Sequence, residues 1–202
     1  MQSHAANAIR ILAALLIPVC FVGCVEEVKP IQKLVDDLGS DESRERYKAA
    51  KQLSKTGLRG SKNENDAAAA AEALAKTLSE SDRDVRYYSA KALAKLGPNA
   101  VKAVDALAIA LSDTDPDVRY YVAKALDNLE SDAAPAVAAL TTALGDENEQ
   151  VRYRAAKALG NIGPEAKEAV PTLEQVLKDD SSDTVREAAT AAVKRISQIK
   201  KG

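Results

Sequence analysis

The chain repeats one short stretch, VRYYSAKAL at residues 85–93. Three further copies follow it and one degenerate copy precedes it: VRYYVAKAL at 118–126, VRYRAAKAL at 151–159, VREAA at 185–189 and ERYKAAKQL at 45–53. The arginines of the last four copies are spaced by about 33 residues, and the first lies about forty residues earlier. A repeat of this period predicts a solenoid, in which each unit buries its apolar face against its neighbours.

Each copy has the pattern of an amphipathic helix. Val85, Ser89 and Leu93 fall on one stripe at helical spacing, and the same holds for the copies that follow. Residues that favour helix N-caps stand three positions before the Val, namely Asp82, Asp115, Asn148 and Ser182. A Gly marks the end of three copies, at Gly57, Gly97 and Gly163. The third copy carries Glu130 instead, so a looser turn is expected over 130–134.

A second apolar helix is expected between successive copies, so each repeat is a helical hairpin. The first helices of the five hairpins are predicted near 28–38, 65–79, 99–111, 134–144 and 165–178. Their partners are predicted near 43–56, 83–96, 116–129, 149–162 and 183–199. The repeat units are then 28–57, 64–97, 98–130, 132–163 and 164–199, which together form one domain over 28–199.

The repeats resemble the HEAT-like family, in particular its short-repeat branch named after phycobilin-lyase proteins. The resemblance is carried by an acidic residue six positions before each repeat Arg, with Val directly before that Arg. It implies an all-α fold, a right-handed α-solenoid of about five antiparallel helical hairpins. It also implies that these charges form a ladder that ties neighbouring repeats together, through Glu80, Arg86, Asp113, Arg119, Asp146, Arg152, Asp180 and Arg186.

The N-terminus has the features of an export signal. One cation, Arg10, precedes an uncharged run over 11–25, which is too short to span a membrane as a helix and fits the apolar region of a signal peptide. The run ends in FVGC at 21–24, which resembles the lipobox of bacterial lipoproteins. The resemblance implies a signal peptide over 1–23, lipid on Cys24 and a short tether over 24–27. An uncleaved anchor and a plain secretory signal are the alternatives.

The lipobox resemblance also implies a location. The protein is expected in the bacterial cell envelope, anchored to a membrane by its lipid. Val25 directly after the Cys favours the outer membrane or the periplasmic face, by similarity to enterobacterial lipoproteins.

The composition excludes several classes of chemistry. The formal net charge of −2 argues against a strongly basic nucleic-acid-binding protein. The single His is His4 and the two Cys are Cys20 and Cys24, which leaves little material for metal sites or His-based catalysis. The acids at 113, 115 and 117 resemble the start of a calcium loop, but Val118 stands where an EF-hand requires Gly. We therefore expect no enzyme activity, no metal and no cofactor.

The tyrosines give the positive signal for binding. All six follow a repeat Arg directly or by one residue, and a Lys follows one helical turn later in four copies. The resemblance places this part of the second helix on the concave face of the superhelix. Tyr and Arg are enriched in interface hot spots, and cations beside aromatic rings favour an acidic or anionic partner. The predicted binding residues are Tyr47, Lys51, Tyr87, Tyr88, Lys91, Tyr120, Tyr121, Lys124, Tyr153, Arg154 and Lys157.

Two other interpretations of the tyrosines stay open at this point. The rings could simply pack between repeats, with the lysines forming a solvated face copied by duplication. Alternatively, a protein similar to the phycobilin lyases would hold a tetrapyrrole in the same groove. The first function expected is a scaffold for protein–protein interaction, with an acidic protein partner, a membrane contact through Cys24 and no nucleic acid.

Overall fold

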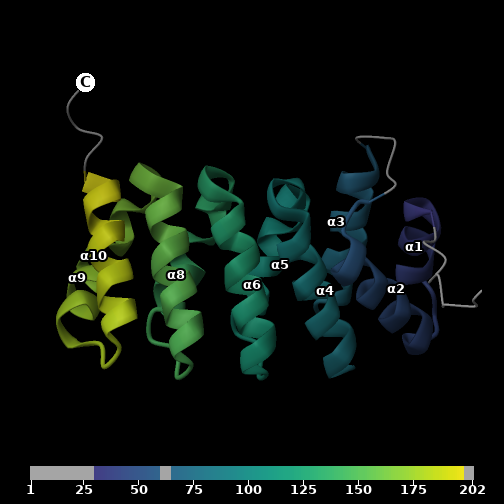
Figure 1. The fold of residues 1–202 in the computed structure, drawn as a ribbon, viewed down its shortest axis with the longest axis horizontal. Coiled ribbons are helices and arrows are strands. Elements are labelled where there is room, and N and C mark those ends of the chain that lie inside the picture. The colour runs from purple at the N-terminus through teal and green to yellow at the C-terminus, as the bar shows by residue number, and fades with distance from the viewer. Residues whose placement is uncertain (1–29, 60–64, 198–202) are drawn as a thin grey trace, which may run out of the picture.

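The computed structural model describes residues 30–59 and 65–197 (Figure 1). The predicted signal peptide, Cys24 and the tether lie outside these residues. The described part is helical and contains no strand, which confirms the all-α prediction. Its α-helices are α1 (Ile31–Leu38), α2 (Ser43–Thr56), α3 (Asn65–Thr77), α4 (Arg83–Leu96), α5 (Val104–Ala110), α6 (Pro116–Asn128), α7 (Val137–Ala143), α8 (Glu149–Ile162), α9 (Val170–Asp179) and α10 (Asp183–Ser197).

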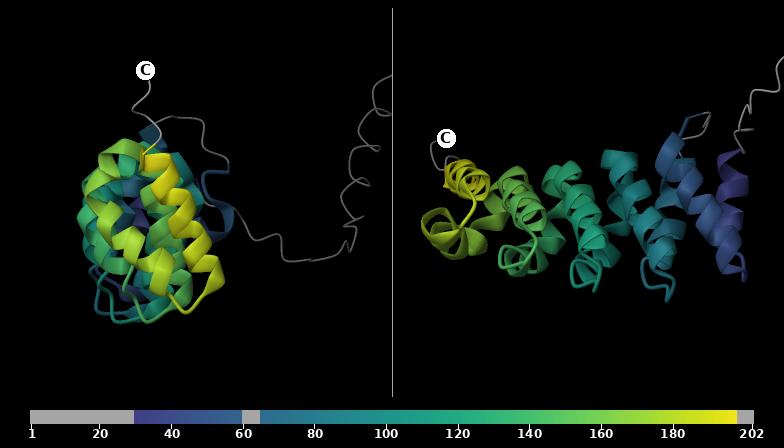
Figure 2. Two further views of the ribbon diagram at one scale, coloured as in Figure 1. Left: turned by 90° about the vertical axis from the view of Figure 1, so that its left-hand side faces the viewer. Right: turned by 60° about the horizontal axis from the view of Figure 1, so that its bottom comes forward.

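The helices form two layers that run the length of an elongated molecule. The five even-numbered helices lie side by side in chain order, and each contacts the next (Figure 1). The odd-numbered helices form the other layer, and each packs against the even-numbered helix that follows it. Figure 2 shows the stack in two further views, one along its long axis and one tilted. The hairpins follow one another along that single axis. This is the predicted α-solenoid, and we refer to its even-helix side as the second-helix face.

The core consists of repeated small and branched apolar residues rather than aromatic rings. Each first helix carries one fully buried Leu, for example Leu74, Leu107 and Leu140, and others occupy the second helices. The stripe predicted from Val85, Ser89 and Leu93 is buried, and the Ser89 hydroxyl lies 2.7 Å from that of Thr77. Because every hairpin is flanked by others, Ala and Leu can bury their surface without one large central core.

The predicted N-caps are present at three of the second helices. Each cap oxygen accepts hydrogen bonds from the backbone N–H groups two and three residues later, at Asp82, Asp115 and Asn148. These bonds satisfy donors that would otherwise lack a partner inside the helix.

The first helices of the last three repeats differ from the prediction. Each begins as a 3₁₀ segment, η1 (Gly97–Ala103), η2 (Glu130–Ala136) and η3 (Gly163–Ala169), and becomes α-helical only from a Val. Ala103 and Ala136 join the two parts with ψ close to 3°, which bends the chain there. A 3₁₀ turn and an α turn place apolar residues at similar spacing, so the sequence pattern did not separate them.

The prediction of a looser turn over 130–134, after the third repeat, is wrong. Glu130 adopts a φ of 51°, close to the values of 58° and 59° at Gly57 and Gly97, so it shares the positive φ of the glycines at this position. A side chain in this conformation costs on the order of 1 kcal/mol. The 3₁₀ segment nevertheless begins at Glu130 just as it begins at Gly97 and Gly163 in the neighbouring repeats.

Within 30–59 and 65–197, no helix is long and apolar enough to cross a bilayer.

Candidate functional site

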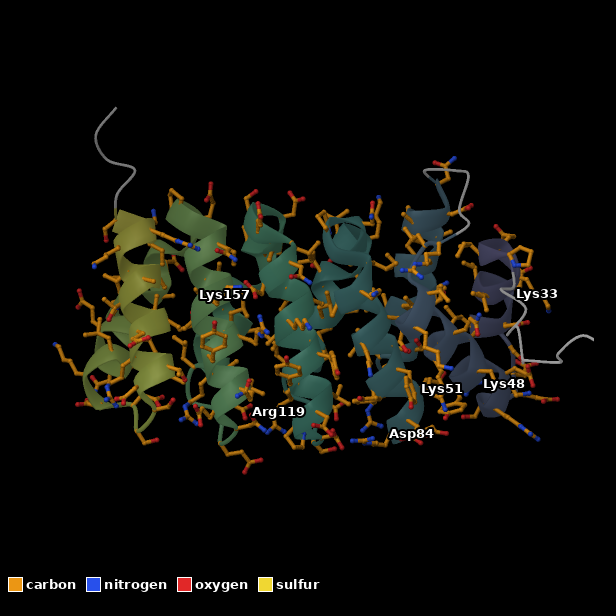
Figure 3. The ribbon with its side chains drawn as sticks, viewed as in Figure 1. Lys33, Lys48, Lys51, Asp84, Arg119 and Lys157 are labelled. Carbon is orange, nitrogen blue, oxygen red and sulfur yellow. The ribbon has the colours of Figure 1, made fainter. Side chains whose placement is uncertain are left out.

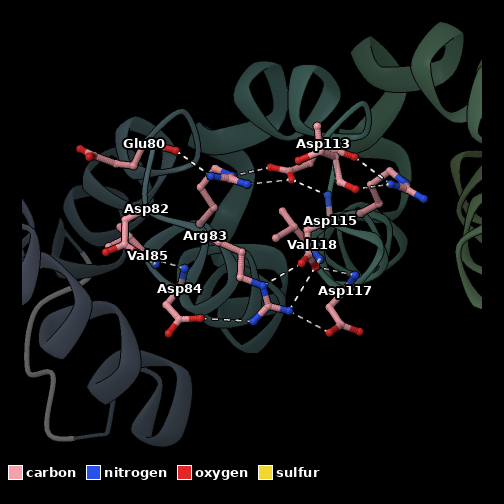
Figure 4. A network of polar contacts seen from close by, with 12 residues as sticks. Glu80, Asp82, Arg83, Asp84, Val85, Asp113, Asp115, Asp117 and Val118 are labelled. Carbon is pink, nitrogen blue, oxygen red and sulfur yellow. Dashed lines mark hydrogen bonds and ion pairs between the residues drawn. The ribbon is translucent and has the colours of Figure 1, made fainter.

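A ladder of arginine and acidic side chains runs along the edge of the solenoid where the second helices begin (Figure 4). Arg86 reaches Asp113 of the next repeat, with its Nε donating at 2.7 Å and its Nη2 at 3.2 Å. The same bidentate contact joins Arg119 to Asp146 and Arg152 to Asp180, and in each the Arg Nε lies 2.7 Å from an Asp Oδ2. These ion pairs therefore link neighbouring repeats, as the family resemblance implies.

Within one repeat, the Arg contacts the backbone of its acidic residue and not the carboxylate. The Nη1 of Arg86 donates to the carbonyl oxygen of Glu80 at 2.9 Å, and the Nη1 of Arg119 donates to that of Asp113 at 2.8 Å. One guanidinium thus closes the turn of its own repeat and pairs with the carboxylate of the next. Arg152 and Arg186 repeat the carbonyl contact with Asp146 and Asp180.

The first rung of the ladder is weaker than the others. Arg46 meets Glu80 through one bond, from Nη2 at 2.7 Å, and its buried Nε has no partner. Glu80 is also more exposed than the aspartates, with 27% of its side chain accessible against 7% for Asp113. Asp113, Asp146 and Asp180 each use both carboxylate oxygens in a bidentate contact with their Arg, which is the stronger geometry.

The ladder and the helix caps account for the acids that resemble a calcium loop. Asp113 is held by Arg86, and Asp115 caps α6 while accepting from Arg83 at 2.7 Å. Asp117 also accepts from Arg83, at 3.0 Å. The hydrogen bond from Arg83 lowers the pKa of the Asp115 carboxyl, so this group is ionised at neutral pH. Within 30–59 and 65–197, no group of His, Cys, Asp and Glu side chains has the arrangement of a metal site.

The tyrosines form a second ladder, across the middle of the second-helix face. All six are half-buried. The ring of Tyr88 meets that of Tyr47 on the preceding helix at a centroid distance of 5.3 Å, and Tyr121 meets Tyr87 in the same way at 5.3 Å. The pairs Tyr87–Tyr88 and Tyr120–Tyr121 join these contacts within each helix, at 4.9 and 5.1 Å. Five rings therefore form one edge-to-face chain across three repeats, a favoured arrangement of aromatic pairs.

The tyrosines thus do pack between repeats, as one of the open interpretations holds. They also leave part of each ring accessible, so packing and binding are compatible roles for the same side chains. Because Tyr88 and Tyr121 each join two repeats, their replacement by Ala would disturb the fold as well as the surface.

Lysine side chains lie over these rings. The ammonium of Lys51 is 5.0 Å from the centre of Tyr47 and 5.3 Å from that of Tyr88, and Lys91 is 5.4 Å from both Tyr87 and Tyr121. Lys124 lies 6.0 Å from Tyr121. The hydrogen bond that Lys51 donates to the Tyr47 hydroxyl, at 2.6 Å, raises the pKa of Lys51. Figure 3 shows Lys157 near the middle of α8 and Arg119 near the lower end of α6.

Three of these ammonium groups have no carboxylate partner among the described residues. Lys51 and Lys91 donate only to tyrosine hydroxyls, and Lys124 contacts a ring. By contrast, the arginines at the edge are neutralised by the charge ladder. The second-helix face therefore presents positive charge on an aromatic base, although the chain as a whole is slightly acidic.

Between α6 and α8, an arginine takes the place of a tyrosine in the ladder. Arg154 stands where the earlier helices have Tyr88 and Tyr121, and its guanidinium lies 5.7 Å from the Tyr120 ring and 5.6 Å from the Tyr153 ring. Its Nη1 donates to Asp127 at 3.0 Å. The arginine therefore continues the ladder to the sixth tyrosine.

Asp127 is a residue that the sequence analysis missed. Only 2% of its side chain is exposed, and it accepts from Arg154, from Lys157 at 3.2 Å and from Asn161 at 2.8 Å. The equivalent position holds Ala94 in the preceding repeat and Gly160 in the next, so a carboxylate there breaks the repeat pattern. An Asp in place of the small residue, together with Arg154 in place of Tyr, was the sequence signal that could have predicted this ion pair.

Two models of known repeats match the chain. A model described as HEAT repeats matches residues 104–194, and one described as PBS lyase HEAT-like repeat matches residues 85–113. No curated protein sequence matches the chain.

Solved structures share the fold. The crystal structure of an engineered protein is 28% identical, covers 83% of this chain and 79% of that chain, and has a TM-score of 0.68. A computationally designed armadillo repeat protein for modular peptide recognition is 20% identical, with coverage of 83% and 99% and a TM-score of 0.55. The complex of CpcE and CpcF of phycocyanin lyase from Nostoc sp. PCC7120 is 22% identical, with coverage of 80% and 96% and a TM-score of 0.53. The two matching models show that residues 85–194 are similar to known HEAT-like repeats, and the solenoid fold agrees with this similarity.

Proposed function

We propose that the chain is a membrane-anchored HEAT-repeat lipoprotein that serves as a scaffold and binds an acidic segment of a partner protein on its second-helix face. The observation that carries the binding proposal is the line of three ammonium groups, Lys51, Lys91 and Lys124, that have no carboxylate partner among the described residues. They lie over rings that pack edge to face against one another, so the rings are already in position before a partner binds. The proposal includes no reaction catalysed by the chain itself.

The proposed occupant follows from the chemistry of this face. A carboxylate can pair with each ammonium, and the exposed ring edges offer apolar contact to the rest of the partner segment. The designed armadillo protein with the same kind of fold is described as made for peptide recognition, which is a parallel for binding along a solenoid. Exported proteins meet acidic protein segments more readily than nucleic acid, so the proposed location favours a protein partner.

The binding proposal predicts a large effect of neutralising the three lysines. The triple variant Lys51→Gln, Lys91→Gln and Lys124→Gln removes the three charges and keeps a polar side chain, with a shorter stem, at each position. Since an accessible ion pair contributes up to about 1 kcal/mol, partner affinity should fall about tenfold or more. Crosslinking in intact cells, followed by mass spectrometry of the captured protein, measures the loss, and circular dichroism checks the fold.

The matched control uses three exposed lysines of the other layer. Lys76, Lys102 and Lys178 all lie on or next to first helices and are exposed. Their replacement by Gln changes the net charge equally and should leave capture unchanged. Equal capture by both triple variants would contradict binding on the second-helix face.

The anchoring proposal rests on the FVGC motif at 21–24 and has its own test. Cys24→Ser should abolish incorporation of radiolabelled palmitate and change the electrophoretic mobility, because the lipid attaches to the Cys24 thiol. Cys20→Ser removes the neighbouring thiol and should change neither property. Labelled Cys24→Ser protein, or loss of label in Cys20→Ser, would overturn the assignment of Cys24.

A further inference from the structure

The tyrosine ladder stops at a groove between α8 and α10. The groove has a volume of about 350 Å³, and its lining includes Tyr153, Lys157, Ala188 and Arg195. Building on the proposed function, we propose that this groove takes one aromatic side chain of the partner segment, next to a carboxylate that pairs with Lys157 and Arg195.

The contacts between the earlier second helices show which kind of side chain fits between two of them. At each earlier junction between second helices, the residue directly after the repeat Arg of one helix contacts the second residue after the repeat Arg of the next. These contacts are Tyr47 with Tyr88, Tyr87 with Tyr121 and Tyr120 with Arg154. At the last junction the first member is Tyr153, but the second is Ala188. One wall of the groove therefore carries a ring whose usual partner is missing.

Small residues keep the groove open and its base rigid. Ala156, Ala188 and Ala191 line it with methyl groups only. At its base the two helices approach closely, since a Cβ added to Gly160 would lie 2.9 Å from the Ala192 Cα. The helices cannot move closer together to fill the space. The volume is at the lower end for ligand pockets, roughly 300–1,000 Å³, and suits a single side chain.

The charges around the groove favour a carboxylate beside the aromatic ring. Lys157 and Arg195 line it, while Glu187 and Thr184 contribute the polar groups of the α10 wall. Lys157 donates to Asp127 at 3.2 Å but still exposes 41% of its side chain, and Arg195 donates to Asn161 from an exposed position. Two accessible cations against one accessible carboxylate, Glu187, leave net positive charge for an acidic neighbour of the ring.

A tryptophan peptide tests the groove directly, because the chain contains no Trp. The probe is acetyl-Gly-Glu-Trp-Glu-Gly-amide, titrated with the full-length protein while the Trp emission is recorded. We expect a saturable blue shift, since the indole leaves water. Ala188→Tyr fills the groove with the ring that the earlier helices carry, and should weaken the peptide at least about fivefold without lowering the melting temperature.

A second variant keeps the test decisive if Ala188→Tyr misfolds. Arg195→Glu replaces an exposed side chain that contacts only Asn161 among the hydrogen bonds described above, and should weaken the Glu-Trp-Glu peptide while strengthening its Lys-Trp-Lys counterpart. Equal binding of the acidic peptide to wild-type protein and both variants, or the absence of any blue shift, would overturn the groove assignment. Loss of partner capture in the Lys51/Lys91/Lys124 variant would then still support the second-helix face, so the two failures are distinguishable.

Discussion

Replacing Arg119 by Ala is expected to lower the free energy of unfolding by about 3–5 kcal/mol. Arg119 and its partner Asp146 each expose 9% of their side chains, so the pair lies largely out of water. The substitution leaves the Asp146 carboxylate without its cation. It also removes the donor to the carbonyl oxygens of Asp113 and Thr114. Urea unfolding followed by circular dichroism measures the change.

Arg83 supplies a matched control for this prediction. It also links one repeat to the next, with its Nε 2.7 Å from Asp115, but 44% of its side chain is exposed. Because water screens an exposed pair, Arg83→Ala should cost less than about 1 kcal/mol. Losses of similar size in the two variants would show that burial does not set the strength of these links.

Replacing Asp127 by Ala is expected to lower the free energy of unfolding by about 3 kcal/mol, because the Arg154 charge then lacks its buried partner. Arg154 and Lys157 would face each other across a methyl group, and Asn161 would lose its acceptor at 2.8 Å. For a domain of this size, the melting temperature should fall by about 6–12 °C. Differential scanning calorimetry measures it.

A second substitution should rescue this loss. Asp127→Ala combined with Arg154→Tyr reproduces the junction between α4 and α6, where Ala94 and Tyr121 hold these positions. Replacing a buried ion pair with packed apolar groups is often neutral or stabilising. The double variant should therefore melt within a few degrees of wild type. A double variant no more stable than Asp127→Ala alone would show that Arg154 is not an alternative to the tyrosine.

The repeat unit was predictable from the sequence because it is a local pattern that recurs. The apolar stripe from Val85 to Leu93 and the caps at Asp82 and Asp115 depend on spacing within one helix, and the structure confirms them. The 3₁₀ start of the first helices was not predictable in the same way. Gly97–Ala103 has apolar residues at a spacing that fits both kinds of helix, and only the packed hairpin separates them.

The partners across repeats could not be assigned from one sequence. The spacing of six residues between Glu80 and Arg86 suggests a pair, but their contact uses the Glu80 carbonyl, and the carboxylate partner of Arg86 is Asp113. The same holds for Asp127, whose cations lie on the next second helix. Side chains about 27 to 30 residues apart meet only because the hairpins stack in one register.

By itself, the sequence determined the solenoid, since units that cannot bury their apolar faces alone must stack on similar neighbours. It also determined that the aromatic residues of the repeats are tyrosines in one repeated place. The tertiary structure decided what those tyrosines do to one another. Whether a ring meets a ring, an arginine or an open groove depends on the side chain that the next helix places opposite it. The distance between these side chains is set by the packing of the helices rather than by spacing along the chain.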